Sequence, residues 1–470
     1  MFSAFSALSV RGRGAARLAA VTFVSGLLAA GATVAVAATA SADEAAQNQR
    51  GATATIGGLK TFGDAVIHGT DGDLQMSAGL FEMSVEGGGT LQTYCVDLYN
   101  PTQKDAKYHE TDWSGTSLGA NKGAGKIRWI LENSYPQVND LAALAARAGI
   151  AAGLTEQDAA AGTQVAIWRY SDHANVDAAD PQAEKLADYL EKSARDIAEP
   201  AASLTLDPPA VSGHPGELLG PVTVHTNAAG ATVTPPADAT TSGVRIVGKD
   251  GRPVTSASNG SELYFDVPED AAAGSADLTV QASTTVPVGR AFASESRSQT
   301  QILAGSSEST VSATASATWA KEGAVPALSA VRNCTEGGLD ITAVNKGDEE
   351  FAFDLMGTEY AIAAGESRTV TVPLQEDQAY DFTITGPDGF AKRFTGVLDC
   401  RTRSSETGAA PQTLSEPSPA TVALPTTDVN LAETGGSATT PLITGTAIAL
   451  VVIGGAALVL TGRKQNRPQD

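Results

Sequence analysis

Alternation of apolar and polar residues is clear around the first cysteine of the chain. The segment from Leu91 to Tyr99 is rich in β-forming residues and predicts a strand. Because successive side chains of a strand point to opposite faces, we expect Cys95 to share a face with a carboxylate. The two expected faces are Tyr94, Val96 and Leu98 on one side and Thr93, Cys95 and Asp97 on the other.

Helical periodicity follows Thr155. Glu156 and Asp158 lie where acidic residues favour a helix start, and the Ala-rich run after them predicts a helix to about Tyr170. Offsets of three, four and seven residues place a carboxamide on an apolar stripe of this helix. The stripe consists of Gln164, Ile167, Trp168 and Ser171.

Two later regions contain short alternating runs separated by Pro, Gly, Asn and Asp. Residues 201–310 predict an Ig-like β-sandwich, and residues 331–401 predict a second small sandwich with a turn at 386–389. Residues 402–430 are rich in Pro, Thr, Ser and Ala and predict a disordered linker. We therefore expect a mainly β multidomain protein with a mixed α+β N-terminal domain, two sandwiches, the linker and a C-terminal transmembrane helix.

The N-terminal 42 residues have the pattern of a secretory signal peptide. Arginines precede an apolar stretch, and Ala40-Ser41-Ala42 supplies a small-residue cleavage pattern before Asp43. The apolar stretch, 18–38, is longer than usual, so an uncleaved membrane anchor stays open as an alternative. Either reading predicts export.

The C-terminal segment 431–470 has three parts. Leu431-Ala432-Glu433-Thr434-Gly435 precedes an apolar run at 441–460 and a basic tail, an order that predicts a bilayer span with a cytoplasmic tail. This arrangement resembles a sortase sorting signal of the LAxTG type associated with class E sortases. The resemblance implies cleavage between Thr434 and Gly435 and attachment to peptidoglycan, with only a transient membrane precursor. A plain tail anchor is the alternative.

Composition narrows the partners. The chain has 470 residues and a formal net charge of −22. Nucleic-acid binding requires clustered Lys and Arg, which the sequence lacks, so no nucleic-acid partner is expected. Five histidines are scattered without metal-ligand spacing, and no cofactor motif occurs. We expect neither a metal nor a cofactor, and we read the Gly87–Gly89 run as a hairpin turn.

Three cysteines in an exported chain allow one disulfide and one remaining thiol. Cys334 and Cys400 bracket the last module, so we expect them to join its first and last strands. The alternative, Cys95 bonded to either of the others, would leave no sulfur for further chemistry. Lys249 and Lys321 are the lysines to check for internal isopeptide bonds, although neither lies in a recognisable motif.

The strings Tyr94-Cys95-Val96-Asp97 and Thr163-Gln164-Val165-Ala166-Ile167-Trp168 contain the two groups of a Cys–Gln thioester. Spacing alone does not show that residues 95 and 164 meet, and a buried cysteine beside an ordinary helix glutamine is the plain alternative. With the intervening 126–136 segment, however, these motifs resemble the thioester domains of Gram-positive surface adhesins over residues 52–198. The resemblance implies a Cys95–Gln164 crosslink, and Asp97 and Trp168 are our candidates for shaping its pocket.

Three functions follow as hypotheses. The preferred one is a wall-anchored adhesin, not an enzyme, in which a surface amine or hydroxyl attacks the Gln164 carbonyl and Cys95 leaves as thiolate. The first alternative is a non-reactive wall-displayed binding or structural protein with Cys95 as an unreacted thiol. The second is an exported acyl-transfer enzyme with Cys95 as nucleophile and His109 or His173 as base. The identity of the captured partner does not follow from the sequence.

Overall fold

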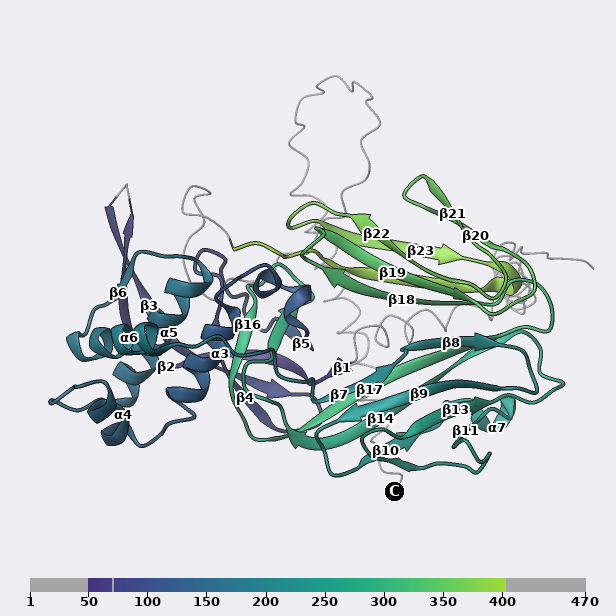
Figure 1. Cartoon of the computed structure of the whole chain (residues 1–470), viewed down its shortest axis with the longest axis horizontal. Coiled ribbons are helices and arrows are strands. Elements are labelled where there is room, and N and C mark those ends of the chain that lie inside the picture. Colours follow the sequence, from purple (N-terminus) through teal and green to yellow (C-terminus); the bar gives the residue numbers. More distant parts are fainter. Residues whose placement is uncertain (1–49, 70–71, 403–470) are drawn as a thin grey trace, which may run out of the picture. The chain divides into compact units, whose positions relative to one another are not determined.

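The computed structural model describes residues 50–69 and 72–402 (Figure 1). The expected signal peptide at 1–42, linker residues 403–430 and the sorting signal at 431–470 with Thr434 and Gly435 lie outside these residues. Across the described part, no helix has the length and apolar composition needed to cross a bilayer. Strands predominate, as the alternating runs predict, and the larger helices all belong to the N-terminal half.

The sheet that contains Cys95 has seven strands in the order β3-β4-β16-β15-β5-β2-β6, and β2 also pairs with β3, so its strands close on themselves. Gly87, Gly88 and Gly89 lie between β3 and β4, all have positive φ and form the predicted turn. The strands are β2 (Thr53–Gly69), β3 (Gly72–Val85), β4 (Thr90–Cys95), β5 (Lys107–Thr111), β6 (Val176–Ala178), β15 (Ala291–Ser294) and β16 (Gln301–Ser306).

Two strands of this sheet come from far along the chain. β15 pairs with β5, and β16 pairs with β4, although the paired residues are about 180 or more positions apart in sequence. The range 52–198 expected for the N-terminal domain therefore covers only part of the sheet. Residues 291–306, which the sequence placed in the following sandwich, complete it.

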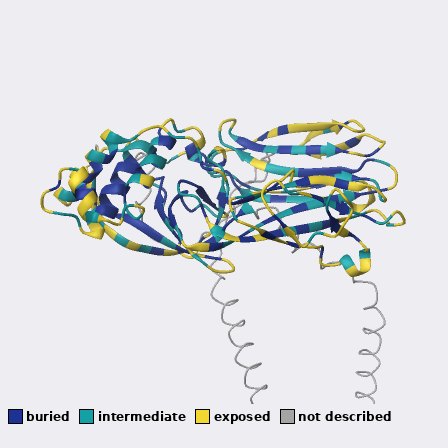
Figure 2. Ribbon diagram, turned by 60° about the horizontal axis from the view of Figure 1, so that its bottom comes forward, coloured by how far each residue is buried: buried dark blue, intermediate teal, exposed yellow. Residues whose placement is uncertain are grey.

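Helices cover one side of this sheet and bury a shared core (Figure 2). Buried residues of the helices pack against Tyr94, Val96 and Leu98 beside the end of β4. The helical elements are η1 (Trp113–Gly115), η2 (Ser117–Gly119), α3 (Ala124–Asn133), α4 (Leu141–Arg147), α5 (Glu156–Ser171) and α6 (Pro181–Ser193).

A two-sheet sandwich takes most of its strands from the residues between β6 and β15, whereas its strands β1 and β17 come before and after the seven-stranded sheet in sequence. One sheet has the order β1-β17-β14-β10-β12, with β8 parallel to β17, and the other has the order β11-β13-β9-β7. Inward residues such as Val222, Phe265, Leu278 and Ala315 form its core. Its elements are β1 (Arg50–Gly51), β7 (Leu204–Asp207), β8 (Ala210–Gly213), β9 (Leu218–Thr226), β10 (Ala231–Thr234), α7 (Ala239–Ser242), β11 (Arg245–Val247), β12 (Ser256–Ala257), β13 (Glu262–Asp266), β14 (Gly274–Thr285) and β17 (Glu308–Trp319).

The last module has a three-stranded sheet, β18-β19-β22, and two hairpins, β20-β21 and β23-β24. Aromatic and aliphatic residues including Ile341, Phe351 and Phe394 form its core. The predicted turn at 386–389 contains η3 (Pro387–Gly389) and joins β23 to β24. The strands are β18 (Pro326–Asn333), β19 (Gly338–Asn345), β20 (Phe351–Leu355), β21 (Thr358–Ile362), β22 (Ser367–Pro373), β23 (Ala379–Thr385) and β24 (Ala391–Val397).

Candidate functional site

Cys95 is the last residue of β4, which is shorter than the predicted 91–99 strand. Val96 still donates its N–H to Thr300 O, but the Leu98 N–H donates to the Asp172 carboxylate at 3.1 Å. The Asp172 side chain therefore takes the place that a neighbouring strand would have at Leu98, and the strand pairing of β4 ends before this residue. The predicted alternation holds up to this point, because Tyr94 packs in the core beneath the helices whereas Cys95 packs in the other core cluster.

Gln164 lies in the middle of α5, where the sequence places it. Thr155 caps the helix, and Asp158 completes a capping box with the Thr155 backbone N–H, so the start is fixed as predicted. Residues from Ala159 to Trp168 are all buried, which goes beyond the single apolar stripe expected. Small residues make this possible: a Cβ at Gly162 would lie 2.4 Å from Ala183 O of α6, so only glycine allows this helix contact.

The carboxamide of Gln164 pairs with the backbone of Cys95. Its Oε1 accepts the Cys95 N–H at 3.0 Å, and its Nε2 donates to Cys95 O at 2.9 Å. The register between β3 and β4 ends at Phe81 and Thr93, so the outward backbone groups of Cys95 have no strand partner on that side. The side-chain amide occupies this place as a peptide group of a neighbouring strand would. The fold thus brings the two candidate residues together.

Both residues are shielded from solvent. Cys95 and Gln164 are each 0% exposed. In such a site a hydrogen bond is stronger than in water, and hydrolysis of an activated carbonyl is suppressed. The Cys95 N–H also polarises the Gln164 carbonyl and would face the negative oxygen of a tetrahedral adduct. The arrangement is suited to acyl chemistry at the Gln164 side-chain carbon.

A residue that the sequence did not single out contacts the sulfur. Gln301, the cross-strand partner of Cys95 on β16, donates its Nε2 to Cys95 Sγ at 3.1 Å. Thr102 Oγ1 lies 3.9 Å from the same sulfur. The signal in the sequence was weak: residues 298–301 form a polar Ser-Gln-Thr-Gln run between β-rich segments, and the structure buries all four. A polar run in a solvent-exposed strand would look the same.

The two residues proposed to shape the pocket are both buried. Asp97 is 2% exposed and follows Cys95 after the end of β4. Trp168 is fully buried within the core cluster of the helices, and its indole Nε1 has no acceptor among the described residues. The burial of Trp168 fits the core alternative as well as the pocket role, so both roles stay hypotheses.

Asp172 ties the two halves of the site together. Its carboxylate accepts the Leu98 N–H just after Cys95 and the Ser171 hydroxyl at the end of α5. Burial raises the pKa of Asp172 to about 7, although both hydrogen bonds oppose this rise. Near neutral pH the folded protein therefore holds this group partly protonated.

Replacing Asp172 with Asn should remove a pH dependence of stability. A folded pKa of about 7 exceeds the unfolded value of 3.8, so the folded state binds the extra proton and wild-type stability falls as pH rises between them. At about 1.4 kcal/mol per pKa unit, wild type should lose about 3 kcal/mol more than Asp172→Asn between pH 5 and pH 8. Denaturant unfolding at both pH values measures this. Equal losses in the two proteins would show that Asp172 titrates normally.

The two histidines of the enzyme hypothesis lie in different settings. His109 uses both ring nitrogens elsewhere, with Thr53 Oγ1 at 3.0 Å and with Glu295. His173 is exposed and has a positive φ after the end of α5. A general base must reach the proton that it removes, so the geometry gives no support to these two residues as partners of Cys95.

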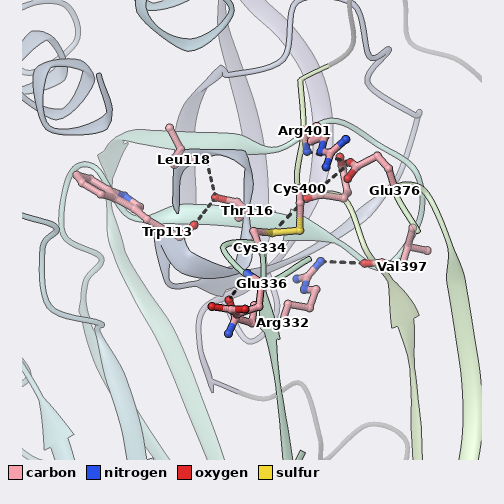
Figure 3. Close-up of a disulfide and its surroundings, with 12 residues drawn as sticks. Trp113, Thr116, Leu118, Arg332, Cys334, Glu336, Glu376, Val397, Cys400 and Arg401 are labelled. Carbon is pink, nitrogen blue, oxygen red and sulfur yellow. Dashed lines mark hydrogen bonds between the residues drawn. A yellow bond between two sulfur atoms is a disulfide. The ribbon is translucent and has the colours of Figure 1, made fainter. Parts of the chain in front are cut away.

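The disulfide joins Cys334 and Cys400, as expected, with a Cα–Cα distance of 5.0 Å (Figure 3). These residues follow β18 and β24, the first and last strands of the module. Cys95 is outside this bond, so the alternative pairings are wrong. The Glu376 carboxylate accepts the Cys400 and Arg401 N–H groups beside the bridge.

Removing this disulfide should destabilise the last module only. The closed loop separates its ends by 66 residues, for which chain entropy gives about 4 kcal/mol. We expect this module to unfold at a lower denaturant concentration in Cys334→Ala/Cys400→Ala than in wild type. Hydrogen exchange of the module's strands measures this. The exchange of α5 and β4 should stay unchanged. Loss of protection in those elements would mean that the bridge also supports the Cys95 site.

The two lysines marked for internal crosslinks do not have the burial that such bonds need. Lys249 and Lys321 are both exposed. Elsewhere, carboxylate oxygens of Glu376, Asp377 and Asp399 lie within 4.8 Å of one another. Glu376 already accepts two backbone N–H groups, so this cluster has a structural explanation.

Comparisons with known proteins gave two family matches. Residues 92–196 match the model of the thioester domain family, and residues 321–397 match that of the bacterial phospholipase C C-terminal domain. A search of curated proteins gave no significant match.

Two solved structures are similar over long stretches. The Bacillus anthracis TIE protein is 15% identical, with a TM-score of 0.26, over 74% of this chain and 64% of its own length, so the chain spans somewhat less than two thirds of that protein. The thioester domain of the Enterococcus faecium TIE86 protein is 16% identical, with a TM-score of 0.27, over 58% of this chain and 97% of its own. The match to the thioester domain family covers residues 92–196, a region that contains both Cys95 and Gln164.

Proposed function

We propose that this protein captures a partner covalently through an internal thioester between Cys95 and Gln164. The pairing of the Gln164 carboxamide with the Cys95 backbone carries this proposal, because it holds the two reacting groups together in a buried site. The match of residues 92–196 to the thioester domain family supports it.

The thioester would form within one molecule, by addition of the thiol and then loss of ammonia. Cys95 Sγ attacks the Gln164 side-chain carbon, the carbonyl electrons move to Oε1, and the Cys95 N–H stabilises that oxygen. The adduct then expels the amide nitrogen, which takes up the thiol proton and leaves as ammonia. One C–S bond replaces one C–N bond, and no oxidant or cofactor is required.

In the capture step, the Cys95 thiolate would be the leaving group and a nucleophile of the partner would take its place. A primary amine or hydroxyl of the partner attacks the same carbon, and the C–S bond breaks because thiolate is a far better leaving group than an amide ion. The partner is then held by an amide or ester, and its lost proton neutralises the thiolate. Each molecule acts once, so the protein is a binding protein and not an enzyme.

The setting of this chemistry is the outside of the cell. An N-terminal signal peptide, a disulfide and the LAETG segment are together consistent with export and sortase attachment to peptidoglycan at Thr434. We propose a surface protein that presents the Cys95 site to amines or hydroxyls on an unidentified protein or glycan. The sandwich and the last module would form the stalk.

Uptake of a labelled primary amine tests this function. We expect incubation with methylamine to add one molecule per protein, and peptide mapping should place it on Gln164. Uptake that stops at one equivalent supports single use. No uptake by folded protein would favour a non-reactive display protein, and repeated turnover of an acyl substrate would favour an enzyme.

A further inference from the structure

We infer that Gln301 is the positioning residue that stabilises the Cys95 sulfur as it becomes a thiolate. The inference rests on the proposed thioester and assigns a role to β16, which lies between the sandwich strands β14 and β17 in sequence. Its amide Nε2 donates to Cys95 Sγ at 3.1 Å, within the range for a hydrogen bond to sulfur.

The sheet register explains why Gln301 reaches the sulfur. Cys95 and Gln301 are directly opposite on β4 and β16. The Cys95 backbone groups turn away from β16 toward Gln164, so this pair lacks mutual backbone bonds. In antiparallel sheets such pairs have the closer side chains. The strand pairing itself therefore sets the contact between the amide and the sulfur.

A second contact fixes which end of the amide faces the sulfur. Thr93 Oγ1 donates to Gln301 Oε1 at 3.0 Å, and the oxygen end is thereby held on Thr93. The NH₂ end must then point to Cys95. Thr93, Cys95 and Gln301 are all 0% exposed, so the amide has no water to exchange with. The Gln301 side chain is held as a hydrogen-bond donor before any reaction begins.

The chemistry needs a donor at this place. When an amine attacks the Gln164 carbon, the electron pair of the C–S bond moves to sulfur, and negative charge develops in a buried site. A hydrogen bond to an ionised group is stronger than one between neutral groups. Gln301 thus lowers the barrier to opening, and it also favours the thiolate that forms the bond at the start.

The thiol pKa of Cys95 provides a test that needs no thioester. In a Gln164→Ala background the bond cannot form, and the ¹³Cβ shift of Cys95 reports its ionisation. Gln301→Met removes the donor at similar length, and Gln301→Glu replaces it with a carboxylate that opposes the thiolate. We expect either change to raise the thiol pKa by about 1 unit or more, the equivalent of one hydrogen bond to a charged group.

Gln299→Met is the matched control. Gln299 is equally buried but donates its amide to Thr102 instead of the sulfur. In the Gln164→Ala background, Gln299→Met should keep the thiol pKa within about 0.3 unit of the Gln164→Ala parent, well below the shift expected for one lost hydrogen bond. In the protein that retains Gln164, Gln301→Met should slow methylamine uptake about tenfold, as expected for one lost hydrogen bond to a charged group.

Two results would overturn the role of Gln301. One is an unchanged thiol pKa in folded Gln301→Glu and Gln301→Met, and the other is an equal rise in Gln299→Met. Failure of the proposed function would give a different result. The wild-type protein would take up no amine, but the Gln301 variants would still differ in thiol pKa from the protein that retains Gln301. If Gln301→Met does not fold, Gln301→Leu takes its place, because it also removes the donor without adding a charge.

Discussion

Replacing Gln164 with Glu should abolish amine uptake, although the side chain keeps nearly the same shape. A carboxylate is not attacked by a thiol at neutral pH, so no thioester forms. One carboxylate oxygen can still accept the Cys95 N–H, whereas the other would face Cys95 O without a proton to donate. We expect labelling at background level in a folded protein, measured by methylamine uptake and mass spectrometry.

Cys95→Ala is the partner variant to Gln164→Glu. It removes the sulfur and keeps both backbone groups that hold the Gln164 carboxamide. It should also show background labelling, with an intact amide at Gln164. Labelling of residue 164 in Cys95→Ala would contradict the mechanism, because an unactivated amide does not react with methylamine at a useful rate.

Truncating the protein after residue 198 should destroy the site, although that range contains both motifs. The fragment lacks β15 and β16, so β4 keeps β3 but loses its pairing with β16, and Cys95 loses Gln301. The fragment also lacks Arg290, which forms an ion pair with Glu110. Both side chains of this pair are 3% or less exposed. An unpaired buried charge alone costs about 3–5 kcal/mol.

Residues 50–320, which retain β15, β16 and the sandwich, are the matched control for this truncation. We expect the longer fragment to take up methylamine and to show cooperative unfolding, whereas 50–198 should lack both. Circular dichroism and amine labelling of the two fragments measure this. A shorter fragment that folds and labels normally would show that the later strands are not needed.

The local elements of the site could be predicted because short-range patterns determine them. The capping box at Thr155 and the alternation around Cys95 fixed the helix start and the faces of β4. Bracketing by Cys334 and Cys400 likewise predicted the disulfide. In each case neighbouring residues carry the information.

The long-range parts could not be read in this way. Nothing local to residues 291–306 shows that they pair with β4 and β5 instead of the sandwich, because a β-rich run is compatible with either sheet. Gln301 was missed for the same reason, since its role depends on a partner 206 residues away. The early end of β4 depends on the Asp172 side chain from α5. Such contacts are decided by tertiary packing.

The intact mass of the freshly purified protein tests the thioester most directly. The account requires a mass lower by one ammonia than the sequence with its Cys334–Cys400 disulfide, a deficit absent from Cys95→Ala and from Gln164→Glu. A protein of full mass, with a thiol at Cys95 that titrates on unfolding and an ordinary amide at Gln164, would contradict it.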